Sequence, residues 1–241
     1  EQADLHLNTP RPIRLFAALL WFATGTAMAQ QDHLDTRGRD FWLGFMQNAS
    51  GTQQLSLKIA SAISTTGTVS VPLSGWSTTF SVVANGVTSV TVPNIYESSG
   101  SEGVLNRGIH VVTADPVTVS ALNYQNQTTD AAQVLPIGSL GVSYRVEALP
   151  GTSTIFPNGT YIFRSEFLVV ASADGTEVQI TPSTATTGGH PANVPFTVQL
   201  NQGQTYPVLA LSGIADLTGT LIEGTSASGP KAFAKGVRTP P

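Results

Sequence analysis

The chain has 241 residues, enough to bury one or two β-sandwich cores. Its 11 basic and 15 acidic residues leave a net charge of −4, and 11% of the residues are charged, against about a quarter in an average soluble domain. No basic stripe is present to neutralise phosphates, so nucleic acid is not expected as a partner. The chain has no Cys, so no disulfide can stabilise it in an oxidising compartment.

Residues 1–29 have the order of an export signal. Two arginines precede the apolar residues 15–23, and Ala27-Met28-Ala29 supplies the small residues of a cleavage site. The apolar part is too short for a stable membrane-spanning helix. We therefore expect cleavage before Gln30, a secreted or cell-surface location, and no membrane insertion of the mature chain. A buried N-terminal helix is the alternative.

Residues 38–48, Gly-Arg-Asp-Phe-Trp-Leu-Gly-Phe-Met-Gln-Asn, predict a first buried strand, because the apolar run is too short for a buried helix. Successive side chains of a strand point to opposite faces. Phe41, Leu43 and Phe45 share one face, and Trp42 and Met46 occupy the other. Both faces must then be covered, as in the middle of a sandwich.

Strand patterns follow every eight to twelve residues, with turns between them. They cover residues 55–63, 68–72, 79–83, 87–92, 108–113 and 116–124. Asn85-Gly86 predicts a hairpin turn, and Ala114-Asp115 a turn whose next residue is Pro116. Residues 125–141 break the alternation, and we interpret them as a crossover loop in which Thr129 could cap one helical turn.

The second half repeats this order. Its strand patterns cover residues 167–173, 176–181, 196–200, 205–211, 219–223 and 230–234. Gly175 stands where Gly67 stands, and Pro230 where Pro116 stands. The sequence therefore predicts an all-β protein of two tandem Ig-like sandwiches, residues 30–141 and residues 142–241, with residues 142–164 as a bridging stretch. Shared β spacing without duplication is the alternative.

Alternation also predicts two cores. The first comprises Phe41, Phe45, Leu57, Ile59, Val90, Val119 and Leu122. The second comprises Phe167, Val169, Val178, Ile180, Val198 and Leu221.

Short motifs along the chain carry a family resemblance. They are residues 38–48, Ser101-Glu102-Gly103, Arg107-Gly108-Ile109-His110-Val111, residues 115–119, Thr128-Thr129-Asp130-Ala131, Leu135-Pro136, Leu140-Gly141, Ser165-Glu166-Phe167, residues 200–206 and residues 216–220. Their order resembles the N-terminal domain of the IgGFc-binding protein family, found in animal mucus proteins and bacterial surface proteins. The resemblance implies an extracellular binding module, whereas Fc binding rests on the family's name alone.

Two departures from the family shape our expectations about the source and the C-terminus. Animal members are secreted into a setting that favours disulfides, so the absence of Cys predicts a bacterial member. An apolar strand is expected to continue after Pro230, but the chain ends at Pro241. We therefore expect a fragment whose second sandwich is truncated.

No residue pattern predicts catalysis. The Gly-x-Ser-x-Gly turn of the common serine hydrolases is absent, no helical stretch follows any strand, and no His or Cys pair has metal-ligand spacing. An enzyme, a cofactor and a metal site are not expected, and His110 is expected to be structural. Asp40, Glu102, Asp130 and Glu166 leave a calcium site open as the less favoured alternative.

The best candidate for ligand binding is a polar stretch that follows an aromatic residue. Tyr124, Gln125 and Asn126, with Thr129 and Asp130, place an amphipathic ring beside amides and hydroxyls. An ordinary polar loop, anchored by a Tyr that packs its ring, is the favoured interpretation of the same residues. Trp76 could stack on a sugar, although covering the end of a sandwich is the commoner role.

These observations favour a non-catalytic binding or adhesion module that recognises an extracellular protein or a glycan. The alternative is an accessory carbohydrate-binding domain of an exported enzyme.

Overall fold

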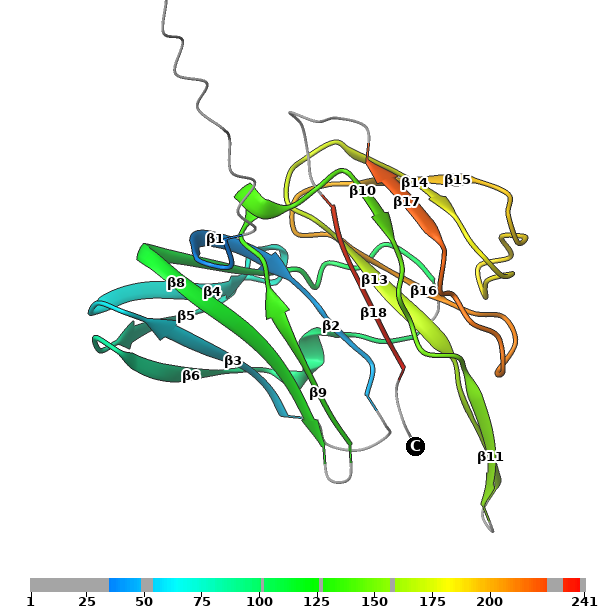
Figure 1. The fold of residues 1–241 in the computed structure, drawn as a ribbon, viewed down its shortest axis with the longest axis horizontal. Helices are drawn as coiled ribbons and strands as arrows, with labels where there is room; N and C mark the ends of the chain where they lie inside the picture. Colours follow the sequence, from blue (N-terminus) through cyan, green and yellow to red (C-terminus); the bar gives the residue numbers. More distant parts are fainter. Residues whose placement is uncertain are drawn as a thin grey trace, which may run out of the picture. The chain divides into compact units, whose positions relative to one another are not determined.

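The computed structural model describes residues 35–48, 54–100, 102–125, 128–156, 159–224 and 232–238. These ranges contain β-strands and three short 3-10 helices, and no α-helix (Figure 1). In the same part of the chain no helix has the length and apolar character needed to cross a membrane. The expected signal peptide lies outside the described residues. From residue 34 onward the chain forms one compact unit.

The first half forms a sandwich organised around one long strand, β8. Its strands are β1 (Gly38–Leu43), β2 (Phe45–Met46), β3 (Gln54–Ser61), β4 (Thr65–Val71), β5 (Trp76–Val82), β6 (Gly86–Val92), β7 (Glu97–Ser98), β8 (Ile109–Gln125) and β9 (Thr128–Val134). The order is β5-β4-β8-β3-β6, and β1 and β9 also pair with β8. The 3-10 helices are η1 (Pro72–Ser74), η2 (Asn94–Tyr96) and η3 (Ile137–Ser139).

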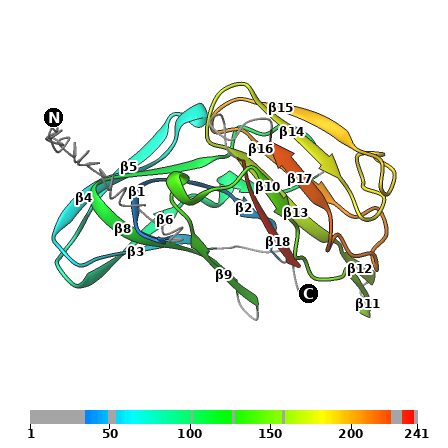
Figure 2. The ribbon, with the colours of Figure 1, turned by 45° about the horizontal axis from the view of Figure 1, so that its top comes forward.

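Strand β8 belongs to both layers of this sandwich (Figure 2). Residues 109–113 pair with β1 and β4, whereas residues 118–125 pair with β3 and β9. The turn predicted at Ala114-Asp115 is therefore wrong, because the strand continues through Pro116 as it passes between layers. Proline has no backbone N–H to donate to a neighbouring strand. It is therefore tolerated at Pro116, where the pairing partners of β8 change.

The predicted crossover loop after residue 125 is also wrong in its first part. Residues 128–134 form β9, which pairs antiparallel with β8 from Gln125↔Thr128 to Val119↔Val134. Thr129 begins no helical turn. A polar strand of this kind gives no apolar alternation, and its pairing with β8 decides its conformation.

The second half repeats the strand pairings of the first. Its strands are β10 (Ser143–Arg145), β11 (Thr152–Phe156), β12 (Gly159–Phe163), β13 (Ser165–Ala171), β14 (Thr176–Thr181), β15 (Phe196–Leu200), β16 (Thr205–Leu209), β17 (Leu221–Gly224) and β18 (Ala232–Arg238). Strand β3 pairs with β6 and β8, and β13 pairs with β16 and β18. Strand β4 pairs with β5 and β8, and β14 pairs with β15 and β17.

This agreement is what a tandem pair of sandwiches predicts, and the all-β sandwich class is confirmed. The predicted bridging stretch holds β10 and the β11–β12 hairpin. The division between residues 141 and 142 stays a prediction.

Two separate hydrophobic clusters correspond to the two predicted cores. All of the predicted first-core residues except Leu122 are buried. Val119 shares its face of β8 with Ala121 and Asn123, so Leu122 points the other way. In the second core Val198 is half-buried against the cluster, and Ile222 takes the buried position predicted for Leu221.

The first strand is buried on both faces, as predicted. Phe41, Leu43 and Phe45 join the first core. Trp42 and Met46 form a third cluster with Leu168 and Val170 of β13, and half-buried Ile137 packs against it. The short β1–β2 segment therefore packs against both halves.

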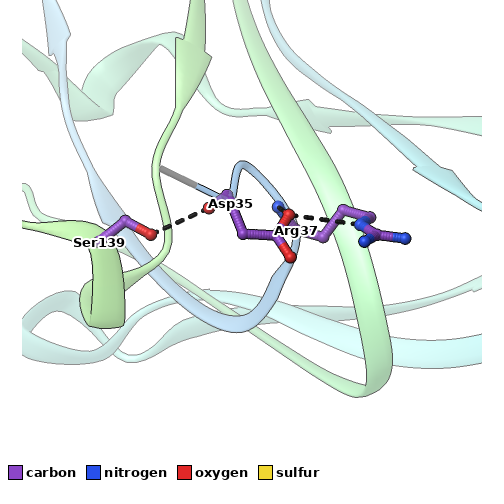
Figure 3. Close-up of polar contacts among 3 residues, drawn as sticks. All are labelled: Asp35, Arg37 and Ser139. Atoms are coloured by element: carbon purple, nitrogen blue, oxygen red, sulfur yellow. Dashed lines mark hydrogen bonds and ion pairs between the residues drawn. The ribbon is translucent and has the colours of Figure 1, made fainter. Parts of the chain in front are cut away.

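The approach to β1 is fixed by polar contacts, shown in Figure 3. The Asp35 carboxylate accepts from the Arg37 backbone N–H at 2.9 Å and from its guanidinium Nε at 3.3 Å. Ser139 of η3 donates its hydroxyl to the Asp35 carbonyl at 2.9 Å. The described chain is therefore attached to the end of the first sandwich before β1 begins.

Alternation in β3 can be tested with two neighbouring substitutions. Leu57 is fully buried, whereas Lys58 is exposed and donates to Ser89 Oγ at 2.9 Å. Leu57→Asp buries an unpaired carboxylate and should unfold the first sandwich. Lys58→Asp should change the free energy of unfolding by about 1 kcal/mol or less. Circular dichroism with thermal melts checks both, and equal tolerance of the two changes would contradict the register.

Candidate functional site

The predicted binding residues that the structure describes lie near the end of the β8–β9 hairpin, with Tyr124 and Thr129 on one face and Gln125 and Asp130 on the other. Tyr124 is opposite Thr129, and Gln125 is opposite Thr128. The side chain of Tyr124 is 44% exposed, and Thr129 is exposed beside it. Asn126 lies outside the described residues. The hairpin therefore presents an aromatic ring next to the Thr129 hydroxyl on one face and the Gln125 amide on the other, on a paired scaffold instead of the loop that the sequence suggested.

A buried amide network anchors the base of this hairpin. Asn123, the residue before Tyr124, donates its amide to the Met46 carbonyl at 3.0 Å. Asn48 donates its own amide to the carbonyl and side-chain oxygens of Asn123, both at 3.3 Å, and its backbone N–H to Glu97 Oε1 at 3.0 Å. Asn48, Glu97 and Asn123 are all buried. The network connects β8 with the β2–β7 pair and limits movement of the hairpin at its root.

Sequence reasoning missed this network. Asn48 begins an Asn-x-Ser triplet, which indicates a glycan acceptor as readily as a buried amide. Glu97 stands in a short segment without alternation. Only the parallel pairing of Phe45 with Glu97 brings these residues together.

Two buried carboxyl groups lie near the hairpin root. Burial raises the pKa of Glu97, and the backbone N–H of Asn48, the Asn123 side chain and the charge of Arg107 partly offset the rise. Burial raises the pKa of Glu166 well above its usual range, and the carboxylates of Glu97 and Asp130 raise it further. In the described part of the chain, Glu166 Oε1 is buried without a hydrogen-bond partner. The folded state therefore favours the neutral form of Glu166 more than the unfolded chain does.

The structure does not bring the four carboxylates of the calcium alternative together, because they have different partners. Asp40 Oδ1 lies 2.9 Å from His110 Nε2, and Glu102 binds residues of the second half. Only Asp130 and Glu166 lie near each other. Among the described residues no group of three or more His, Asp or Glu side chains is placed to hold a metal ion.

Glu102, in the first half, forms polar contacts with residues of the second half. Its carboxylate accepts from the hydroxyls of Thr186 at 3.0 Å and Thr187 at 3.2 Å, and from the backbone N–H of Leu209 at 3.3 Å. His190 Nε2 lies 3.8 Å from the same carboxylate. Burial, followed by the charge of Glu102, raises the pKa of Tyr206 to about 12. Glu102 therefore acts as a buried polar link between the halves.

The other candidate residues have structural surroundings. The His110 ring stacks on Trp42 with centroids 4.2 Å apart and an interplanar angle of 7°, as expected for a structural histidine. Trp76 is half-buried against the first core, with its ring centroid 5.8 Å from that of Tyr96. This position fits the role of covering the end of a sandwich better than that of a sugar platform.

Comparison with known proteins agrees with the motif resemblance. Residues 130–238 match the protein family described as IgGFc binding protein. This part of the chain is therefore similar to a domain of that family. A human protein named IgGFc-binding protein is 31% identical over 229 residues, which cover 91% of this chain and 4% of the relative. The chain thus spans only about 4% of that relative's length. No solved structure matches the chain.

The family resemblance is confirmed by these matches, and it begins upstream of residue 130 in the human alignment, since that alignment covers most of the chain. The expectations of a bacterial source and of a truncated second sandwich stay predictions.

The raised pKa of Glu166 predicts a pH-dependent difference between wild type and Glu166→Gln. The folded wild type binds the Glu166 proton more tightly than the unfolded chain, so stability falls as pH rises from the unfolded pKa through the folded pKa. Glutamine stays neutral. Glu166→Gln should therefore resemble the wild type at acidic pH and become the more stable protein at alkaline pH, as measured by urea unfolding.

The matched control is Glu223→Gln, a change at an exposed carboxyl on β17. This control should give no comparable gain at alkaline pH. If wild type and Glu166→Gln keep the same relative stability from acidic to alkaline pH, the assignment of a raised pKa to Glu166 fails.

Proposed function

We propose that the chain is a non-catalytic binding module of an exported or cell-surface protein, and that it presents the end of the β8–β9 hairpin to an extracellular protein or glycan. The observation that carries the proposal is the exposed ring of Tyr124 on a hairpin whose root is tied by the Asn48–Asn123 contacts. Exposed aromatic residues on a rigid support supply contact area at low entropic cost.

The neighbours of Tyr124 suit polar recognition. Thr129 stands directly across the hairpin on the same face as Tyr124, whereas Gln125, the next residue of the strand, presents its amide on the other face. Hydroxyl and amide groups can donate and accept, and a tyrosine ring can pack on either a peptide or a sugar. Neither a protein nor a glycan ligand is excluded by this chemistry.

Export is supported by the order of residues 1–29 and by the family match. The name of the human relative refers to binding of immunoglobulin G Fc. Fc is therefore a sensible probe. Because the chain corresponds to a small share of that relative, the Fc activity is not carried over to the chain.

The absence of catalysis is supported by how the polar residues are used in the described part of the chain. His110, His190, Asp40 and Glu102 are engaged in packing or in contacts between segments. A glycan ligand together with a catalytic domain elsewhere in the complete gene would favour the accessory-domain alternative.

Replacing Tyr124 tests the hairpin directly. The probes are immunoglobulin G Fc, a mucin glycoprotein and an array of extracellular glycans, screened against the mature chain. Tyr124→Ala should weaken binding of any probe that the wild type retains by about tenfold or more, because a central aromatic anchor is lost. Tyr124→Phe, which keeps the ring, should lose less. Biolayer interferometry measures all three proteins.

Ile95→Ala is the matched control. Ile95 is 68% exposed on η2, and the substitution removes a large apolar side chain outside the hairpin. Equal affinity of the Tyr124→Ala and Ile95→Ala proteins would move the binding site elsewhere. Turnover in a broad hydrolase and transferase screen would contradict the non-catalytic part of the proposal.

A further inference from the structure

Two sheet edges of the first sandwich lie beside each other. Among the described strands, β5 pairs only with β4, and β6 pairs only with β3. The turn at residues 83–86 joins them tightly, with the Gly86 N–H donating to the Val83 carbonyl at 2.9 Å and Asn85 at a φ of 57°. Both open edges therefore face the same side of the sandwich.

The backbone of β5 presents hydrogen-bonding groups to this side. The Ser81 carbonyl accepts from the Thr88 hydroxyl of β6 at 2.6 Å, so it points toward β6 and away from β4. In an antiparallel ladder each residue directs its N–H and C=O to the same side, and the side alternates along the strand. Ser77 and Thr79 therefore also direct their backbone groups to the open edge. No described strand pairs with them there.

A groove runs between the two edges. It is lined by residues 76–81 of β5 and residues 88–91 of β6, with a volume of ≈ 500 Å³. This volume lies in the range of pockets that hold ligands. The lining residues include no charged side chain, and exposed hydroxyls predominate: Ser77, Thr79, Ser81, Ser89 and Thr91.

Both edges lack the devices that usually prevent strand addition. Proteins protect exposed edges with lysines, prolines, bulges or very short strands. Strands β5 and β6 have seven residues each and contain neither a charged residue nor a proline. The nearby Lys58 lies on β3, where its ammonium is bound to Ser89. An exported protein that keeps such an edge open would be prone to aggregation unless another chain covers it.

We propose that an extended, uncharged segment of a partner polypeptide adds to the β5 edge as a further strand and lies in this groove. The outward N–H and C=O groups of Ser77 and Thr79 provide the ladder that a strand requires. The uncharged lining matches an uncharged segment, since a charged one would be dehydrated without a counter-charge. A glycan is less suited, because it would use the hydroxyl side chains and leave the backbone groups unpaired. This site is separate from the β8–β9 hairpin.

The test uses a random peptide library displayed on phage, selected against the wild-type mature chain and then against variants. Thr79→Pro removes the outward N–H, and proline is tolerated on an edge strand at such a position, so the pairing with β4 is kept. Thr79→Val removes only the hydroxyl. Selected peptides should be uncharged, should bind Thr79→Pro about tenfold more weakly, and should bind Thr79→Val within about twofold of wild type. Thr79→Lys, with an unchanged backbone, is the second blocking variant if the proline variant does not fold.

A structural measurement accompanies the affinities. On peptide binding, the amide hydrogens of Ser77 and Thr79 should become protected from exchange, whereas those at the hairpin end near Tyr124 should not change. The Tyr124→Ala protein should bind the same peptides as the wild type, so failure of this proposal and failure of the hairpin proposal are distinguishable.

Several results would overturn the proposal. The selection could enrich no peptide, or the enriched peptides could bind Thr79→Pro and Thr79→Lys as tightly as wild type. Protection from hydrogen exchange could also occur elsewhere in the chain and not at Ser77 and Thr79. A glycan whose binding is lost in Thr79→Val would assign the groove to sugars. A wild-type dimer that Thr79→Pro dissociates would assign the edge to a second copy of this chain.

Discussion

The fold depends on the short β1–β2 segment, which must be covered on both faces. Alternation sends Phe41, Leu43 and Phe45 into the first core, and leaves Trp42 and Met46 on the opposite side. Neither large side chain tolerates exposure to water, so Leu168 and Val170 of β13 cover them. The second half is therefore bound to the first by the same segment that completes the first core.

Polar contacts between the two halves make this apolar packing geometrically specific. Glu102 accepts three hydrogen bonds from the second half, and Ser98 and Thr205 share a hydroxyl contact of 3.1 Å. Buried polar groups are costly when unpaired, so these contacts favour one arrangement over other apolar packings. The same part of the molecule holds Asn48 and Asn123, which fix the root of the β8–β9 hairpin. A rigid root is what a recognition hairpin needs.

The sequence predicted the features that follow from alternation, and missed those that follow from pairing between distant segments. The two faces of residues 41–46 and most of the two cores could be predicted because burial imposes a period of two on each strand. Strand β9 could not, since Thr129, Asp130 and Gln133 give it a polar sequence and only β8 makes it a strand. The prediction that Leu122 lies in the core was wrong because Leu122 is an odd number of residues from Val119 and so points to the other face.

The candidate site shows the same division. Tyr124 and its polar neighbours were identified from composition, but their facing arrangement across a hairpin was not. The burial of Asn48, Glu97 and Glu166 could not be predicted, because nothing local in the sequence distinguishes a buried amide or carboxyl from an exposed one. The central claim is that β1–β2 makes the two halves one cooperative unit. Its most direct test is differential scanning calorimetry of the wild type and Trp42→Ala. The account predicts a single transition for the wild type, and for Trp42→Ala a decrease of about 3–5 kcal/mol in the free energy of unfolding with separation into two transitions. A single transition for Trp42→Ala at the wild-type midpoint would contradict it.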